Sequence, residues 1–116
     1  MIVTGFGSSF QFGSPFGAAI QSNGDIVLGG EAGNGNTQGF QLGSSSFALT
    51  RYTPSGLLDT SFGNNGIVVT RLSSNLSFIN VVLLQSDGKI VAVGNSGSAG
   101  ESSFVASFVA ARYLAQ

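Results

Sequence analysis

The chain has 116 residues, of which 8% are charged and 42% hydrophobic, and it contains 18 glycines and a formal net charge of -1. Its four cations are scattered, so the sequence lacks the basic patch that phosphate backbones require and we expect no nucleic-acid partner. It has no Cys and no His, which excludes disulfide scaffolds, thiol catalysis, the usual zinc ligands and the usual general base. The length fits one domain, and we predict a protein that is not an enzyme and that uses no cofactor.

Targeting signals are weak throughout the sequence. No stretch approaches eighteen uninterrupted apolar residues, and the N-terminus has neither a basic region nor a continuous apolar run. We therefore expect no membrane span and see no export signal. The compartment stays undetermined from these features.

Gly and β-branched residues interrupt every window of helical periodicity, so the sequence predicts an all-β fold. The first clear unit is a hairpin with strands over residues 18–21 and 26–28 around Asn23-Gly24. Asn-Gly favours a type I′ turn, in which both central residues have positive φ. We predict that turn type here.

A third strand is predicted over residues 47–52 and a fourth over 67–71. The segment between them carries turn chemistry at Pro54-Ser55-Gly56 and at 62–66. Asp59 follows Arg51 by eight residues across this bend. An ion pair between these two side chains, or an Asx-turn at Asp59, is a better interpretation than catalysis.

The same motifs then return. Gln21-Ser22-Asn23-Gly24 reappears as Gln85-Ser86-Asp87-Gly88, where a second hairpin is predicted over 81–85 and 90–93, and Arg51-Tyr52 reappears as Arg112-Tyr113 at the end of a strand over 108–113. The first pair of motifs is 64 residues apart and the second 61, so the first copy has three extra residues in the polar stretch 31–46 relative to 95–103. We predict that both stretches are surface loops.

The chain is therefore interpreted as one domain of two tandem β repeats, about 1–66 and 67–116. Strand residues are apolar at consecutive positions, which predicts that the sheets are covered on both faces and that sheet packs on sheet. Ile2-Val3-Thr4 echoes the fourth strand at 67–70. Because of that echo, the chain begins out of phase with its own repeat.

Three motifs in this order resemble the delta-60 repeat: residues 58–67 (Leu-Asp-Thr-Ser-Phe-Gly-Asn-Asn-Gly-Ile), residues 85–94 and residues 108–113. The first copy departs from the family at Asp25, where Lys is usual, and the second ends at Gln116 before its own Leu-Asp-x-x-Phe-Gly segment. The resemblance implies blades of a β-propeller and a bacterial protein that is secreted or on the cell surface.

Two blades do not close a propeller, which has typically four to eight. A homo-oligomer joined head to tail would close the ring, and we expect such an oligomer. The alternatives are a compact eight-strand β-sandwich or an excerpt of a longer repeat array. Arg112 lacks an Asp equivalent to Asp59, so its partner is expected from another subunit.

Functionally, we predict a non-catalytic β-repeat module for assembly or binding. The five carboxylates show neither the spacing of a Ca²⁺ loop nor a close acid–base pair, so no catalytic and no metal site is predicted; they are Asp25, Glu31, Asp59, Asp87 and Glu101. The alternative function is a carbohydrate-binding, lectin-like module, because the polar loops 31–46 and 95–103 suit a neutral glycan or protein ligand. The absence of Trp weakens that alternative.

Overall fold

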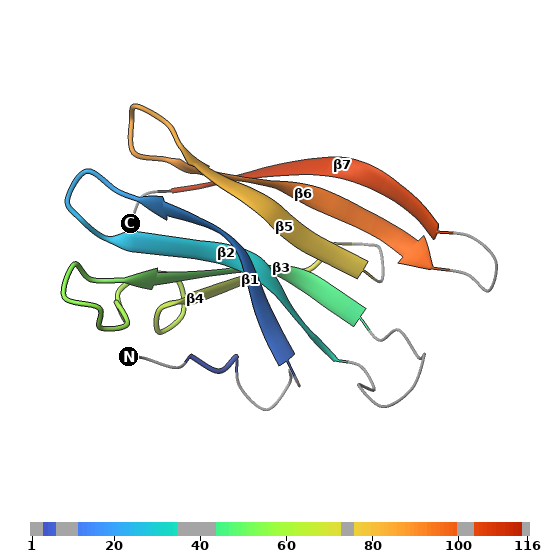
Figure 1. Ribbon diagram of the computed structural model, residues 1–116, viewed down its shortest axis with the longest axis horizontal. Helices are drawn as coiled ribbons and strands as arrows, with labels where there is room; N and C mark the ends of the chain where they lie inside the picture. Colours follow the sequence, from blue (N-terminus) through green and yellow to red (C-terminus); the bar gives the residue numbers. More distant parts are fainter. Residues whose placement is uncertain (1–3, 7–11, 35–43, 73–75, 100–103, 115–116) are drawn as a thin grey trace.

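A computed structural model describes residues 4–6, 12–34, 44–72, 76–99 and 104–114. These residues form seven strands in two antiparallel sheets, and the described part contains no helix (Figure 1). Sheet A has the order β1 (Phe12–Ile20), β2 (Ile26–Asn34), β3 (Ser44–Tyr52) and β4 (Ile67–Thr70), and sheet B has the order β5 (Leu76–Leu84), β6 (Ile90–Ala99) and β7 (Phe104–Tyr113). The predicted all-β fold of two blade-like antiparallel units is confirmed.

Several strands are longer than predicted. β1 begins at Phe12, and β2 and β3 extend through residues 31–34 and 44–46 of a stretch that was predicted to be a loop. β6 likewise covers 95–99. These Gly- and Ser-rich ends pair through their backbones, as at Asn34↔Ser44 and Ala99↔Phe104, and such pairing needs no apolar side chain. The parts of the predicted loops at 35–43 and 100–103 lie outside the described residues.

The two hairpin turns have the predicted positions but not the predicted type. In the first, Gly24 N–H donates to Gln21 O and Gln21 N–H to Asp25 O, and in the described chain Gly24 but not Asn23 has positive φ. This geometry fits a type I turn followed by a left-handed glycine, so the type I′ prediction was wrong. The second turn repeats the pattern, with Gly88 at φ 87.

Each repeat has an irregularity at the same place. The β1–β2 register shifts between Pro15 and Gly17, and the β5–β6 register shifts between Ile79 and Val81. The residues across from the shifts are Gly30 and Gly94, and a Cβ at either would collide with the carbonyl of Ser14 or Phe78. Glycine is therefore required opposite both bulges.

The sheets pack face to face, with β5 in contact with β1, β2 and β3 (Figure 1). The core between them consists of Val27, Phe47, Leu49, Phe62, Ile79, Val82, Ile90 and Ala92. A Cβ on Gly29 would come within 2.5 Å of Val82 Cγ2, so the absent side chain allows the close approach of β2 and β5. The prediction that sheet packs on sheet is confirmed.

No helix among the described residues is long and apolar enough to cross a membrane.

Candidate functional site

Alternation of side chains along the strands gives each sheet two distinct faces. In each repeat, we call the face that carries the odd-numbered positions of β2 or β6, such as Val27 and Val91, the front face, and the opposite face the back face. The front face of sheet A packs on the back face of sheet B, since the space beside Gly29 is filled by Val82 and Ile79. The two repeats are thus stacked front to back, in the same sense.

Buried serines join the two sheets at one end of this interface. Ser45 Oγ donates to the carbonyl oxygen of Ser77 and accepts from Ser77 N–H, both at 3.0 Å. The hydroxyl of Ser77 also shares a 2.9 Å hydrogen bond with the hydroxyl of Ser96. Because all three side chains are buried, these bonds fix the register of β3 against β5.

The front-to-back stacking leaves two outer faces: the back face of sheet A and the front face of sheet B. Phe47, on the front of sheet A, is 0% exposed, whereas its repeat equivalent Phe108, on the front of sheet B, is 95% exposed. Around Phe108 the outer face of sheet B carries further exposed or half-buried apolar side chains, namely Val81, Leu83, Val91, Val93 and Ala110. These side chains form an apolar surface over all three strands of sheet B, interrupted by Arg112 and by the Asn80–Asn95 amide pair.

On the back faces, β2 and β6 show the reverse contrast. Ile90 and Ala92, on the back of sheet B, are fully buried, while the equivalent Ile26 and Leu28 on the back of sheet A are only half-buried. On the front faces, positions that are covered in sheet A are therefore uncovered in sheet B. On the back face of sheet A, by contrast, the β3 residues Ala48, Thr50 and Tyr52 are buried.

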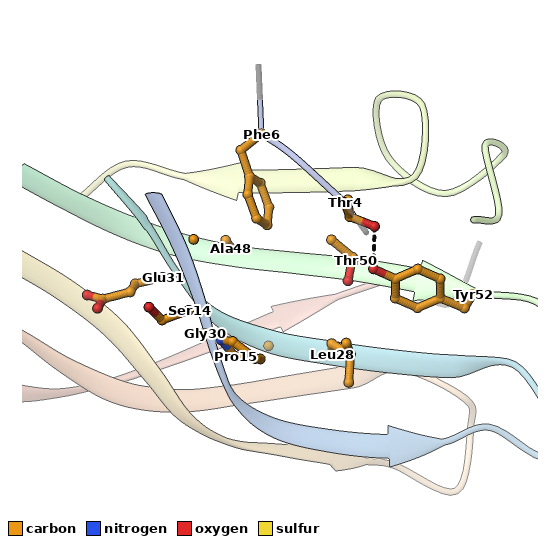
Figure 2. A pocket seen from close by; sticks show the side chains of 12 residues that line it. Thr4, Phe6, Ser14, Pro15, Leu28, Gly30, Glu31, Ala48, Thr50 and Tyr52 are labelled. Atoms are coloured by element: carbon orange, nitrogen blue, oxygen red, sulfur yellow. Dashed lines mark hydrogen bonds between the residues drawn. The ribbon is translucent and has the colours of Figure 1, made fainter. Parts of the chain in front are cut away.

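A short segment at the N-terminal end lies on the back face of sheet A, on the side away from sheet B (Figure 1). The hydroxyls of Thr4 and Tyr52 share a hydrogen bond of 2.6 Å, and Phe6 stands beside Ala48 over a hollow of about 270 Å³ that Leu28 and Thr50 also line (Figure 2). The same hydrogen bond occurs between Thr70 and Tyr113, at 2.7 Å, across the internal interface. The outer Thr4–Tyr52 hydrogen bond thus copies the internal Thr70–Tyr113 hydrogen bond.

Arg51 lies at the centre of a polar cluster at the end of β3. Its Nε donates to Asp59 Oδ2 at 2.8 Å and lies 3.7 Å from Asp25 Oδ2, and its guanidinium stacks over the Phe62 ring at 4.6 Å. Ser61 N–H donates to Asp59 Oδ1, and the Ser61 hydroxyl and Arg51 hold the pKa of Asp59 below its usual value. The predicted Arg51–Asp59 pair and the Asx-turn at Asp59 are both confirmed.

Arg112 has the equivalent place in sheet B, and its side chain is exposed. None of the ion pairs found among the described residues includes it. The residue that corresponds to Asp25 is Lys89, which binds Asp87 at 2.9 Å in its own turn. Among the described residues, the first repeat therefore forms the Arg51 cluster and the second repeat has no equivalent of it.

Of the remaining carboxylates, Glu31 is hydrogen-bonded to Ser45 and Asp87 to Lys89. Burial raises the pKa of Glu31, and hydrogen bonds from the Lys89 side chain and backbone lower that of Asp87. Glu101 lies outside the described residues. Within the described ranges, no three His, Cys, Asp or Glu side chains come together as a metal site would require.

The Thr–Tyr pairs and the serine network were not anticipated from the sequence. The available signal for the Thr–Tyr pairs was the similarity of Ile2-Val3-Thr4 to residues 67–70. Thr4 is followed by Tyr52 at the end of the first repeat's third strand, and Thr70 is followed by Tyr113 at the equivalent position of the second repeat. The serines gave no such signal, since Ser45 and Ser77 are replaced by Ala106 and Gly13 in the other repeat.

Comparison with protein families finds a match for this chain. A family described as a domain of unknown function (DUF5122) beta-propeller matches residues 21–62 and 85–106, which together are more than half of the chain. The chain belongs to this family. Both matches to the DUF5122 β-propeller domain begin at equivalent points, at Gln21 and Gln85 in the two hairpin turns. No curated protein and no solved structure matches the chain.

Proposed function

We propose that this DUF5122 β-propeller domain is a non-catalytic assembly module whose two outer sheet faces dock further blade-like β units. The observation that carries this proposal is the opposite burial of equivalent residues. Phe47 is buried because a second sheet covers it, while Phe108 is exposed because no sheet among the described residues covers the same position. A side chain that is buried by one blade interface is suited to burial by another.

The chemistry of the outer faces supports a β-sheet as the occupant. The front face of sheet B is apolar apart from Arg112 and the hydrogen-bonded amides of Asn80 and Asn95, and apolar patches on a protein surface typically mark interaction sites. On the back face of sheet A, the half-buried Ile26 and Leu28 are available for such a contact. A front-to-back contact between copies would be heterologous, and such contacts form rings when the rotation closes.

Assignment to the delta-60 repeats of bacterial surface or secreted proteins belongs to the same proposal. It is supported by the Leu-Asp-x-x-Phe-Gly segment, because Asp59 and Phe62 from that segment hold Arg51. The motif thus has a structural use in the blade. A non-catalytic role is supported by the same cluster, since Asp25 and Asp59 are engaged with Arg51 and Asp87 with Lys89.

The carbohydrate-binding alternative depends on the polar loops, of which 35–43 and 100–103 lie outside the described residues. The hollow beside Phe6 and Tyr52 is a second place for a neutral ligand, but a docked blade would occupy it. The two functions therefore compete for one surface, and assembly has the support of the repeated interface.

The solution mass tests the proposal. Light scattering coupled to size exclusion, over a range of concentrations, should give a mass above the 11.7 kDa of one chain. Phe108→Asp should reduce the mass to that of the monomer, because a carboxylate on the docked face would be buried without a partner. Leu57→Asp is the matched control, since Leu57 is 65% exposed but lies in the loop after β3. A monomer at every concentration, or equal loss of mass in both variants, would contradict assembly through this face.

A further inference from the structure

We propose that the chain binds a neutral glycan of β-linked hexoses at the edge where the two repeats meet, on a site formed by Phe16, Phe78, Asn80 and Asn95. The aromatic rings stack on the C–H face of a sugar ring, and the two amides bind its hydroxyl groups. None of these four residues lines the hollow beside Phe6. The inference goes beyond the proposed assembly and does not depend on it.

The two register shifts supply one residue of the site each. β1 and β5 are the edge strands of their sheets and are in contact with each other (Figure 1). The extra residues at the bulges are Phe16 in β1 and Asn80 in β5, because neither has a partner in the register of the neighbouring strand. A bulge redirects the side chain at the irregularity. Equivalent bulges thus present an aromatic ring in one repeat and an amide in the other.

Gly17 allows the two bulges to lie close together. A Cβ at Gly17 would lie 3.2 Å from the Asn80 carbonyl oxygen and 3.3 Å from Val81 Cα, so the absent side chain lets the β1 backbone approach that of β5. Phe16, the residue before Gly17, reaches β5 there. Its ring centroid is 6.1 Å from that of Phe78, at an interplanar angle of 53°.

The aromatic pair is open to a ligand. Phe16 is 54% exposed and Phe78 is half-buried. Because the two rings are tilted rather than stacked face to face, neither covers the whole face of the other. The pair therefore offers a ring face that a flat apolar surface of a ligand would cover.

The amide pair adjoins the aromatic pair. Asn80 Nδ2 donates to Asn95 Oδ1 at 2.7 Å, and Asn95 is the register partner of Phe78. An Asn side chain has two N–H donors and one carbonyl oxygen acceptor. With the described residues, the two amides form no other hydrogen bond, so their remaining N–H groups and the Asn80 oxygen are available to a ligand.

This chemistry favours a neutral sugar. None of the four side chains is charged, and ligand sites typically combine an aromatic lining with a few placed polar groups. A β-linked glucose or N-acetylglucosamine unit has equatorial substituents, so its ring presents a C–H face and a rim of hydroxyls that both donate and accept. A proline-rich peptide would also use the aromatic rings, but proline has no N–H to donate to the Asn80 oxygen.

Assembly of further blades would leave this edge accessible. Sheet B covers the front face of sheet A, yet Phe16 remains 54% exposed and Glu31 half-buried. Asn80 and Asn95 hold the equivalent positions in sheet B. A unit docked on the front face of sheet B is therefore expected to leave the two amides exposed to the same degree.

Titration calorimetry and saturation-transfer NMR with cellohexaose and chitohexaose test the inference. At least one of these sugars should bind, with saturation passing from phenylalanine ring protons to the sugar. Phe16→Ala should weaken binding by about tenfold, and Asn80→Asp by several-fold through loss of the donor to Asn95. Ile20→Ala is the matched control, because Ile20 is 68% exposed on the same strand, and it should leave binding unchanged.

Phe16→Tyr keeps the ring and should retain binding, so that a loss in Phe16→Ala reports stacking rather than misfolding. Absence of binding to both sugars, or equal weakening by Phe16→Ala and Ile20→Ala, would overturn the inference. Binding of a decaproline peptide in place of the sugars would also overturn it. All four residues belong to one chain, so a chain that is monomeric by light scattering but binds sugar at Phe16 would support this inference while contradicting assembly.

Discussion

The two repeats differ most where their sequences agree. Phe47 and Phe108 hold the same position in the third strand of their sheets, yet one is fully buried and the other almost fully exposed. Arg51 and Arg112 show the same contrast, with the first enclosed by Asp25, Asp59 and Phe62. Burial in this fold therefore depends on the neighbouring unit, because a single blade-like sheet cannot cover both of its faces.

Truncation of the two phenylalanines should give the largest difference between the repeats. Phe47→Ala should lower the free energy of unfolding by about 3 to 5 kcal/mol, because it leaves a cavity in a core that the sheets close on both sides. Phe108→Ala should change the free energy of unfolding by no more than about 0.5 kcal/mol in dilute solution, since the exposed side chain buries little apolar surface on folding. Chemical denaturation of both variants at one low concentration makes the comparison. Similar losses would show that Phe108 is already covered in the isolated chain.

Loss of the buried serine hydroxyl at position 45 should have the next largest effect. Ser45→Ala leaves the buried Ser77 N–H without its acceptor and should cost about 1 to 3 kcal/mol. The second repeat already has Ala106 at this position, so the substitution makes the internal interface resemble the proposed outer one. Ser55→Ala, in an exposed turn, is the control. Equal unfolding midpoints for the two variants would mean that the network does not join the sheets.

How far the sequence predicted this structure depended on the kind of contact. The hairpins at Gly24 and Gly88 and the Arg51–Asp59 pair arise from residues close in the chain, and local chemistry was enough to predict them. The polar strand ends at 31–34 and 95–99 were assigned to loops because backbone pairing leaves little trace in side chains. In each hairpin turn the glycine has positive φ and the residue before it does not. Asn-Gly and Asp-Gly therefore also fit a type I turn followed by a left-handed glycine.

The burial of the outer sheet faces was harder to predict. Both copies of the third strand are apolar, and nothing within them shows which copy is covered. The contrast between Phe47 and Phe108 appears only when the stacking order of the sheets is known. The Thr4 echo indicated the phase of the repeat, but its hydrogen bond to Tyr52 joins residues 48 apart in the sequence and required the fold.

Substitution of the turn glycines should have a moderate effect in both repeats. Gly24→Val and Gly88→Val place a β-branched residue at φ 93 and 87 and should each cost about 1 to 2 kcal/mol. Gly24→Val should cost more, because its Cβ would also lie 3.0 Å from Pro54 Cγ. Thermal unfolding of both variants tests this order. Unchanged midpoints would mean that the turns rearrange without strain.

The smallest expected difference concerns one carboxylate and responds to pH. Glu31 is half-buried, and burial raises its pKa above the ordinary value of 4.5, whereas the equivalent residue of the second repeat is Asn95, a neutral amide. A raised pKa means that the folded chain holds the proton more tightly, so the related stability is present below pH 4.5 and is lost as the pH rises through the folded pKa. Glu31→Gln should therefore be more stable than the unsubstituted chain at neutral pH and similar to it at low pH. Asp87→Asn should behave in the opposite sense, because hydrogen bonds from Lys89 lower the pKa of Asp87 and that stabilisation disappears as the pH falls. The free energy of unfolding of the three chains, measured from low to neutral pH, tests both expectations. If Glu31→Gln were no more stable than the unsubstituted chain at neutral pH, the assignment would be wrong. The Glu31 carboxylate would then be as well solvated in the folded chain as in the unfolded chain.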